Sequence, residues 1–154
     1  MTKVEFYDPS WLPDGMMTYS VIAARFEEQW IFVRHQKRST WEIAGGHIEK
    51  GETSFDAAKR ELSEETGAEI FDLECISTYS VEKDGETGYG RLYYATVKQL
   101  GPIPDTSEIA EIKLSDHLPD NLTHPDIQPL LFGKILKIFN PQSAPDSYRD
   151  HNPK

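Results

Sequence analysis

Alternating apolar and polar residues indicate that much of the chain forms β-sheet. Two neighbouring runs, Thr18–Phe26 and Trp30–Arg34, are rich in strand-forming residues and flank a short polar turn, which predicts a hairpin. A second pair, Ile70–Val81 and Arg91–Leu100, flanks the polar, glycine-containing segment Glu82–Gly90, which predicts another hairpin with that segment as its loop. Shorter strands are expected at Val4–Tyr7, as an edge strand, and at Ile112–Leu114.

One helix is predicted between two residues that commonly begin and end helices. Thr53 is a good N-cap, Asp56 three residues later completes a capping-box pattern, and Gly67 occupies the position that follows a helix end. The helix is therefore expected at about Ser54–Thr66. Its apolar stripe is expected to lie on the sheet and consists of Phe55, Ala58 and Leu62.

A second helix is predicted near the C-terminus. His124 and Pro125 precede a segment, about Asp126–Phe139, in which apolar residues recur with helical periodicity. We expect this helix to pack on the sheet face opposite the first helix, which gives an α/β fold, an α/β/α sandwich around a mixed β-sheet. Residues 1–140 are expected to form one domain. Residues 141–154 have almost no apolar content and are predicted to be a disordered tail.

The composition limits the class of partner. The chain of 154 residues has a formal net charge of −10, which argues against long nucleic acid, because such binding depends on lysine and arginine neutralising phosphates. No run of about eighteen apolar residues is present, so no membrane span is expected. The single cysteine, Cys75, excludes an internal disulfide, fits a cytoplasmic location, and is expected to be a buried strand residue. A small anion remains a suitable ligand if a divalent metal supplies positive charge.

Three carboxylates gather on the predicted first helix. Glu61, Glu64 and Glu65 repel one another at these spacings, and only Arg60, four residues before Glu64, offers local relief. One interpretation is a solvated acidic helix face. The other is a metal site, and because the ligands are all oxygen atoms the implied ion is Mg²⁺, or Mn²⁺ as a substitute.

The segment Gly45–Ala68 resembles the Nudix box, a pattern of glycine, five residues, glutamate, seven residues, and then R-E-U-x-E-E-x-G-U, where U is a bulky apolar residue. The matching residues are Gly46, Glu52, Arg60, Glu61, Leu62, Glu64, Glu65, Gly67 and Ala68. Ala68 is smaller than the usual closing residue, which affects only packing behind the helix. The pair Gly45–Gly46 is expected to form a turn after Trp41–Ile43.

The resemblance implies an enzyme that hydrolyses a nucleoside diphosphate linked to another group, by attack of metal-activated water on phosphorus. It implies that Glu64 and Glu65 bind the metal together with the Gly45 carbonyl. Glu61 then binds a second ion or accepts the proton of the attacking water. Arg60 is expected to hold Glu64 or Glu52 in place, with Glu52 as a supporting acid.

Residues outside the box complete the predicted site. Arg34 and His35 belong to the one dense basic cluster, which is either a charged loop or a contact for substrate phosphates. By resemblance, an acid from the segment before the last strand can join the metal site or act as a base. Glu108 fits this role best and Glu111 second, so Glu61, Glu108 and Glu111 remain alternatives for the base.

The substrate is expected to be a small nucleotide, and the protein a monomer or homodimer. The chain looks like the MutT-type nucleoside triphosphate pyrophosphohydrolases, including those that act on oxidised guanine nucleotides such as 8-oxo-dGTP. These enzymes release a monophosphate and pyrophosphate. Asn121 and Thr123, just before the last helix, are candidate base contacts or ordinary turn residues. Alternatives are dinucleoside polyphosphates, ADP-ribose, nucleotide sugars, RNA 5′ ends, and a noncatalytic nucleotide-binding regulator.

Overall fold

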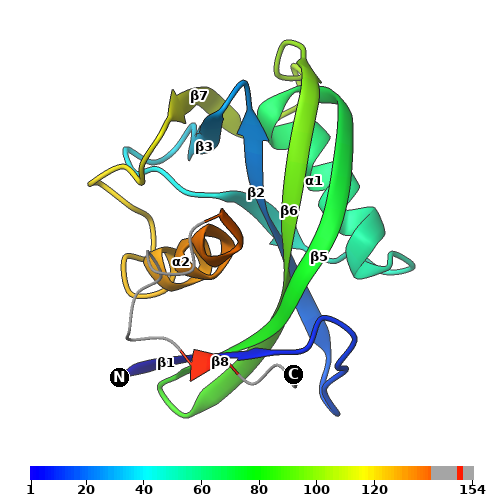
Figure 1. Cartoon of the computed structure of the whole chain (residues 1–154), viewed down its shortest axis with the longest axis vertical. Coiled ribbons are helices and arrows are strands. Elements are labelled where there is room, and N and C mark those ends of the chain that lie inside the picture. The colour runs from blue at the N-terminus through cyan, green and yellow to red at the C-terminus, as the bar shows by residue number, and fades with distance from the viewer. Residues whose placement is uncertain (140–148, 151–154) are drawn as a thin grey trace.

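The computed structural model describes residues 1–139 and 149–150 and consists of one sheet with two helices (Figure 1). The strands are β1 (Thr2–Tyr7), β2 (Met17–Phe26), β3 (Gln29–His35), β4 (Ala44–His47), β5 (Ala68–Lys83), β6 (Glu86–Leu100), β7 (Ile109–Ser115) and β8 (Arg149–Asp150). The helices are α1 (Ser54–Thr66) and α2 (Gln128–Phe139). No helix in the described part of the chain is both long and apolar enough to span a membrane.

The strands form a mixed eight-stranded sheet in the order β7-β3-β2-β6-β5-β1-β8, with β4 paired to β2 beside this path. The pairs β2–β6 and β1–β8 are parallel and the other pairs are antiparallel. Both predicted hairpins, β2–β3 and β5–β6, are confirmed. The sheet therefore has the mixed character that the sequence predicts.

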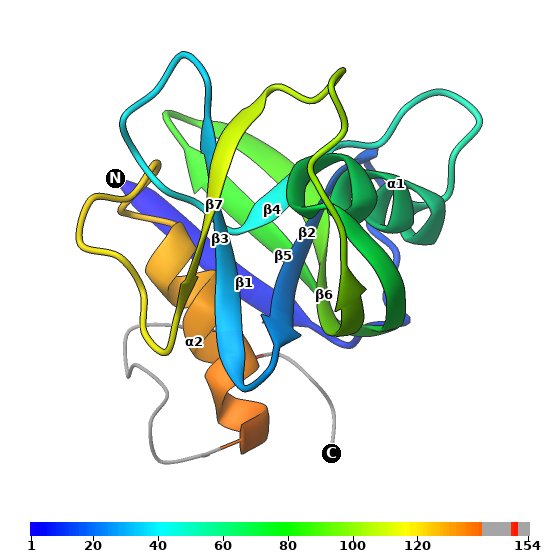
Figure 2. The same ribbon diagram turned by 90° about the horizontal axis from the view of Figure 1, so that it is seen from above.

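The two helices cover opposite faces of this sheet, and each face has its own core. Along β2, Ala23 packs with the core that contains Leu131 and Ile135 of α2, whereas Ile22 and Ala24 pack with the core that contains Ala58 and Leu62 of α1. Figures 1 and 2 show the helices on either side of the strands. Side chains alternate between the faces of a strand, so one sequence run supplies both cores. The predicted α/β/α sandwich is confirmed.

Helix α1 begins and ends where its capping residues predict. Thr53 accepts a hydrogen bond from the Asp56 amide, the Asp56 side chain accepts one from the Thr53 amide, and Gly67 follows the helix with φ of 81°. The predicted apolar stripe is wrong at Phe55, which is 42% exposed. Ala57 is buried instead, because the buried face of the helix includes Ser54, Ala58 and Leu62 and Phe55 lies at its margin.

Several predicted boundaries shift in the structure. The expected loop Glu82–Gly90 is only the two-residue turn Asp84–Gly85, whose positive φ angles of 55° and 81° match a hairpin turn, so both strands continue to it. The last long strand begins already at Ile109 because it pairs with β3. α2 begins at Gln128, after a turn in which the His124 carbonyl accepts two amide hydrogen bonds.

The two ends of the chain pair with each other in the sheet, which the sequence did not predict. β1 is not the edge strand, because β8 pairs with it at Glu5 and Phe6. The predicted disordered tail, residues 141–154, otherwise lies outside the described residues, so that prediction stays open. Cys75 is in β5 and partly buried, as expected.

Candidate active site

The glycine pair before α1 lies in a strand and not in the turn that the sequence suggested. Gly45 and Gly46 belong to β4 and pair with Val21 and Ser20 of β2. A Cβ atom at Gly46 would lie 1.8 Å from Glu61 Oε2, and one at Gly45 would lie 2.6 Å from the Ser20 carbonyl oxygen. Gly46 therefore lets α1 bring Glu61 directly against the backbone of β4, and Gly45 allows the close approach of β2.

Glu65 is the most buried carboxylate of the site. Its side chain is 9% exposed, and its Oε1 accepts a hydrogen bond of 2.9 Å from the Gly45 amide. Burial raises its pKa to about 8, opposed by the Gly45 hydrogen bond and supported by the negative charges of Glu61, Glu42 and Glu108. The folded protein alone therefore compensates the ionised form of Glu65 poorly.

Glu61 and Glu64 differ sharply in environment although they are three residues apart. The Glu61 side chain is 14% exposed, and burial raises its pKa to about 7, against the attraction of Arg60 and with the repulsion of Glu64. The Glu64 side chain is 49% exposed and lies 3.5 Å from Arg60 Nη1. Arg60 Nη1 is also 3.4 Å from Glu61 Oε2, so one guanidinium lies beside both acids.

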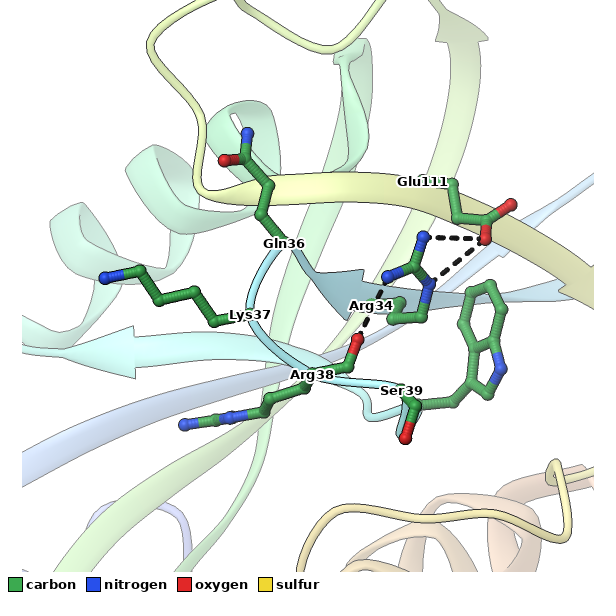
Figure 3. A pocket seen from close by; sticks show the side chains of 7 residues that line it. Arg34, Gln36, Lys37, Arg38, Ser39 and Glu111 are labelled. Carbon is green, nitrogen blue, oxygen red and sulfur yellow. Dashed lines mark hydrogen bonds and ion pairs between the residues drawn. The ribbon is translucent and has the colours of Figure 1, made fainter.

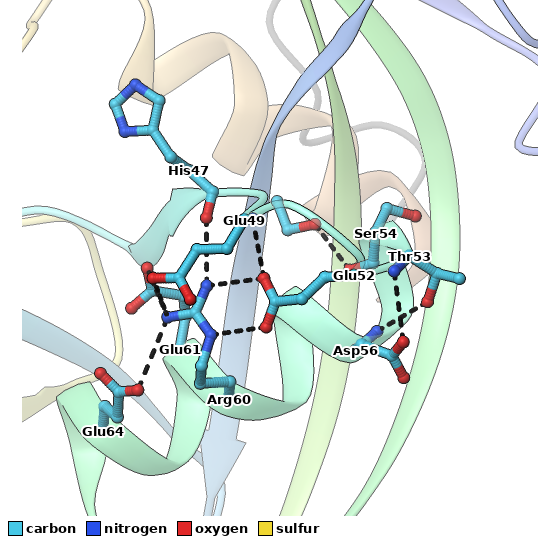
Figure 4. Close-up of polar contacts among 10 residues, drawn as sticks. His47, Glu49, Glu52, Thr53, Ser54, Asp56, Arg60, Glu61 and Glu64 are labelled. Atoms are coloured by element: carbon cyan, nitrogen blue, oxygen red, sulfur yellow. Dashed lines mark hydrogen bonds and ion pairs between the residues drawn. The ribbon is translucent and has the colours of Figure 1, made fainter.

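Arg60 is fixed mainly by Glu52. Its Nε and Nη2 donate to the two Glu52 carboxylate oxygens at 2.7 and 2.9 Å, and Nη2 also donates to the His47 carbonyl at 3.1 Å (Figure 4). The Glu49 amide donates to Glu52 at 2.8 Å. Arg60 holds the pKa of Glu52 down to about 2. This geometry suits the predicted supporting roles of Arg60 and Glu52, because the bidentate pair ties α1 to the segment that follows β4.

The carboxylates fit a hard divalent cation by donor type and by charge. Oxygen ligands are those that Mg²⁺ and Mn²⁺ prefer. Glu61 and Glu65 are both largely buried, and a bound positive charge would relieve the desolvation and repulsion that raise their pKa values. Among the residues that the structure describes, no three acidic, histidine or cysteine side chains already converge as a metal cluster. Glu61 and Glu64 lie beside Arg60 instead, so a metal must compete with Arg60 for them.

Two residues predicted outside the box do lie near Glu65. His35 Nε2 is 3.7 Å from Glu65 and 3.6 Å from Glu42. Glu108 is exposed just before β7, and its negative charge contributes to the raised pKa of Glu65. His35 and Glu108 therefore both lie close to Glu65 of the box helix.

Arg34 and Glu111 pair with each other in the structure and not with the box carboxylates. They form an ion pair of 3.0 Å across the pairing of β3 with β7, and Arg34 Nη1 donates to the Arg38 carbonyl at 2.9 Å (Figure 3). Together with Trp41 they line an open depression of about 510 Å³ that contains none of the box carboxylates. Strand alternation explains the outcome, because Arg34 and His35 point to opposite faces.

A second cavity, of about 490 Å³, lies directly beside β4. Its walls come from β2 to β6, from α2 and from the segments before β4 and α2. They consist of Tyr19, Val21, His35, Arg38, Glu42, Ile43, Gly45, Gly46, His47, Tyr79, Val81, Lys83, Glu86, Gly88, His124, Ile127, Gln128 and Leu131. Neither Asn121 nor Thr123 lines it. Their backbone groups instead bond to Trp41, which is the turn role that the sequence left open for them.

Sequence reasoning missed two of the polar residues that line this cavity, Gln128 and Tyr79. A glutamine at the start of the apolar pattern of α2 was the one available signal. Nothing in the local sequence showed that it faces a cavity.

Comparison with known proteins identifies the family of the chain. A model of the NUDIX domain matches residues 16–130. A Bacillus subtilis (strain 168) protein named "Putative 8-oxo-dGTP diphosphatase YtkD" is 31% identical over 102 residues, which are 66% of this chain and 64% of that protein's length. The crystal structure of the Bacillus subtilis pyrophosphohydrolase BsRppH has a TM-score of 0.71 at 24% identity, covering 88% of this chain and 90% of that one.

A crystal structure of UDP-X diphosphatase has a TM-score of 0.68 at 19% identity, covering 92% of this chain and 70% of that one. These two structures agree with the chain in fold. The matched domain spans most of the chain and includes the whole box. Members of this family typically use divalent metals and bind small nucleotides. The chain therefore belongs to the Nudix family.

Proposed function

We propose that this chain is a Mg²⁺-dependent nucleoside triphosphate pyrophosphohydrolase of the MutT type, with oxidised guanine nucleotides among its substrates. It cleaves between the α and β phosphorus atoms and releases a nucleoside monophosphate and pyrophosphate. The observation that carries the proposal is the shared wall between the cavity and the carboxylates. Gly45 and Gly46 line the cavity and also contact Glu65 and Glu61.

This shared wall sets the direction in which a substrate binds. The cavity is of the size that holds a small organic ligand, and it has apolar walls at Val21, Val81 and Leu131. A base and its sugar occupy that space, and the phosphates then pass along β4 to the acids of α1. Because the protein has a net charge of −10, a metal supplies positive charge for holding a triphosphate there.

The proposed metal ligands are Glu64, Glu65 and the Gly45 carbonyl. When bound, Mg²⁺ would neutralise the charge that develops on the phosphate oxygens. It would also lower the pKa of an attacking water. The Gly45 amide fixes the Glu65 carboxylate through its 2.9 Å hydrogen bond. Arg60, held by Glu52, keeps α1 in position against β4.

Proton transfer falls to an acid beside the metal ligands. Glu61 is buried against Gly46 and can receive the proton of the attacking water at its Oε2 atom. Glu108 is the second candidate, since it approaches Glu65 from the segment before β7. His35 lies between Glu65 and Glu42, where it can orient Glu65 or contact a phosphate.

The substrate proposal draws support from the YtkD relative, whose name specifies 8-oxo-dGTP. The match spans 64% of that protein's length. It supports the same type of reaction, and the substrate itself has to be tested. The decisive experiment compares kcat/KM for 8-oxo-dGTP, dGTP, ADP-ribose and a dinucleoside tetraphosphate under identical Mg²⁺. A triphosphate should be preferred, with monophosphate and pyrophosphate as products.

The same assay tests the site. EDTA should abolish activity, and Glu64→Gln should lower kcat by about a hundredfold or more through loss of metal charge stabilisation. Glu74→Gln, an exposed change on β5, is the matched control and should retain wild-type activity. Preference for ADP-ribose or the tetraphosphate by more than about tenfold, or about 1.4 kcal/mol, would refute the substrate proposal. Full activity of Glu64→Gln would refute the proposed metal ligands.

A further inference from the structure

The amide of Gln128 is buried, and its orientation is fixed by the backbone. The residue is 6% exposed, and its side-chain oxygen accepts a 2.8 Å hydrogen bond from the Ile43 amide. A backbone amide can only donate, so the atom facing Ile43 must be oxygen and the other must be the NH₂ group. That NH₂ group has no partner among the described residues, although Gln128 lines the cavity beside β4.

Tyr79 is a second buried polar residue among those that line the same cavity. The residue is 4% exposed and its ring lies over Gly90, where a Cβ atom would be 2.6 Å from the hydroxyl oxygen. Within the described part of the chain the hydroxyl makes no hydrogen bond, and burial raises the pKa of the phenol, so it keeps its proton. Buried polar groups are nearly always hydrogen-bonded in native proteins, so two without partners on one cavity point to a ligand.

We propose that Gln128, assisted by Tyr79, determines base specificity by donating a hydrogen bond to a ring carbonyl oxygen. The ligand class is a nucleotide whose base carries an oxo group, such as hypoxanthine, guanine or uracil, and the disfavoured class carries an amino group there, such as adenine or cytosine. This inference rests on the proposed function, because it places the base of a nucleoside triphosphate in the cavity.

The discrimination follows from the fixed direction of the Gln128 amide. Its NH₂ group can donate to an oxo group, but against an exocyclic amino group it faces another donor. The amide cannot rotate to present its oxygen without leaving the Ile43 amide unpaired in a buried position. The Tyr79 hydroxyl can donate or accept a hydrogen bond, so it can bind a neighbouring ring position of either class of base. It therefore does not oppose the base preference that Gln128 sets.

Two nucleotide pairs isolate this feature. dITP and dATP differ only at the oxo or amino carbon and the adjacent ring nitrogen, and UTP and CTP differ in the same way. The wild-type enzyme with Mg²⁺ should prefer dITP over dATP by about tenfold or more in kcat/KM, and UTP over CTP in the same direction. The preference should appear mainly in KM, because it is a binding difference at the base.

Gln128→Glu keeps an oxygen for the Ile43 amide and removes the donor, so the dITP/dATP ratio should fall to near one or invert. Tyr79→Phe removes only an unpaired hydroxyl, so its melting temperature should equal or exceed that of wild type while KM for dITP rises by about threefold or more. Gln29→Glu, an exposed change at the start of β3, is the matched control. It should leave both ratio and melting temperature unchanged.

The outcomes separate this inference from the proposed function. Hydrolysis of triphosphates with a wild-type dITP/dATP ratio below about threefold, or with a ratio unchanged by Gln128→Glu, overturns the inference and leaves the function standing. Absence of triphosphate hydrolysis overturns both. If Gln128→Glu does not fold, Tyr79→Phe decides: a raised KM for dITP at undiminished melting temperature supports the inference, and an unchanged KM overturns it.

Discussion

Replacing Glu65 by glutamine should stabilise the metal-free protein, although Glu65 is a proposed metal ligand. Its carboxylate is 9% exposed and accepts a hydrogen bond from the Gly45 amide. Glutamine has the same shape and keeps an oxygen for that amide, but it carries no charge. The variant therefore removes the buried charge and leaves the packing unchanged.

The size of the effect follows from the pKa of Glu65. A rise from 4.5 to about 8 corresponds to an upper bound of about 5 kcal/mol for the fully ionised group. The carboxylate can turn toward His35 or solvent, so we expect a gain of about 2 kcal/mol at about pH 8. For a chain of 154 residues this is a rise of about 4 to 8 °C in melting temperature.

The sign of the pH dependence is fixed by the same shift. Glu65 has a higher pKa when folded than when unfolded, so it stabilises the protein fully below about pH 4.5, and this contribution is lost as the pH rises through about 8. Glutamine does not titrate. The difference in melting temperature between Glu65→Gln and wild type should therefore be small at about pH 5 and should grow toward pH 8.

The assay is thermal unfolding in EDTA across that pH range, repeated with Mg²⁺ in excess. Glu64→Gln is the informative comparison, because its exposed side chain should leave the metal-free melting temperature nearly unchanged. Wild type should gain about 2.7 kcal/mol when Mg²⁺ is a hundredfold above its dissociation constant. Both variants should lose most of this gain, and the surface control Glu74→Gln should keep it.

Two results would refute this reasoning. A metal-free Glu65→Gln protein that is less stable than wild type at pH 8 would show that the ionised carboxylate stabilises the fold. A full Mg²⁺ gain in that variant would show that Glu65 does not bind the metal.

Three further predictions test other parts of the structure. Arg60→Lys loses the bidentate pair with Glu52, so Mg²⁺ affinity measured by calorimetric titration should fall by about tenfold. Unchanged affinity would contradict a positioning role for Arg60. Gly46→Ala forces Glu61 Oε2 away, so kcat should fall by about tenfold or more while the circular dichroism spectrum is retained; full activity would count against Glu61. Deleting residues 143–154, which include β8, should shift the melting temperature by less than about 3 °C, because β1 keeps its pairing with β5. A larger fall in melting temperature would show that the tail packs on the domain.

The sequence by itself determined the features that depend on neighbours along the chain. The bounds of α1 follow from Thr53, Asp56 and Gly67, whose capping bonds are made within a few residues. The β2–β3 and β5–β6 hairpins follow from strand-forming runs on either side of short turns. Membership of the Nudix family was also predictable, because the box is a continuous stretch with fixed spacing.

The tertiary structure alone decided which charges are buried and which residues meet. Glu64 and Glu65 are adjacent in sequence, yet only Glu65 turns inward against β4. Arg34 and Glu111 pair with each other in a depression that contains none of the box acids. Tyr79 and Gln128 reach one cavity from β5 and α2. Burial and such distant contacts arise when strands and helices pack together, and no local sequence pattern encodes the side of a sheet on which they meet.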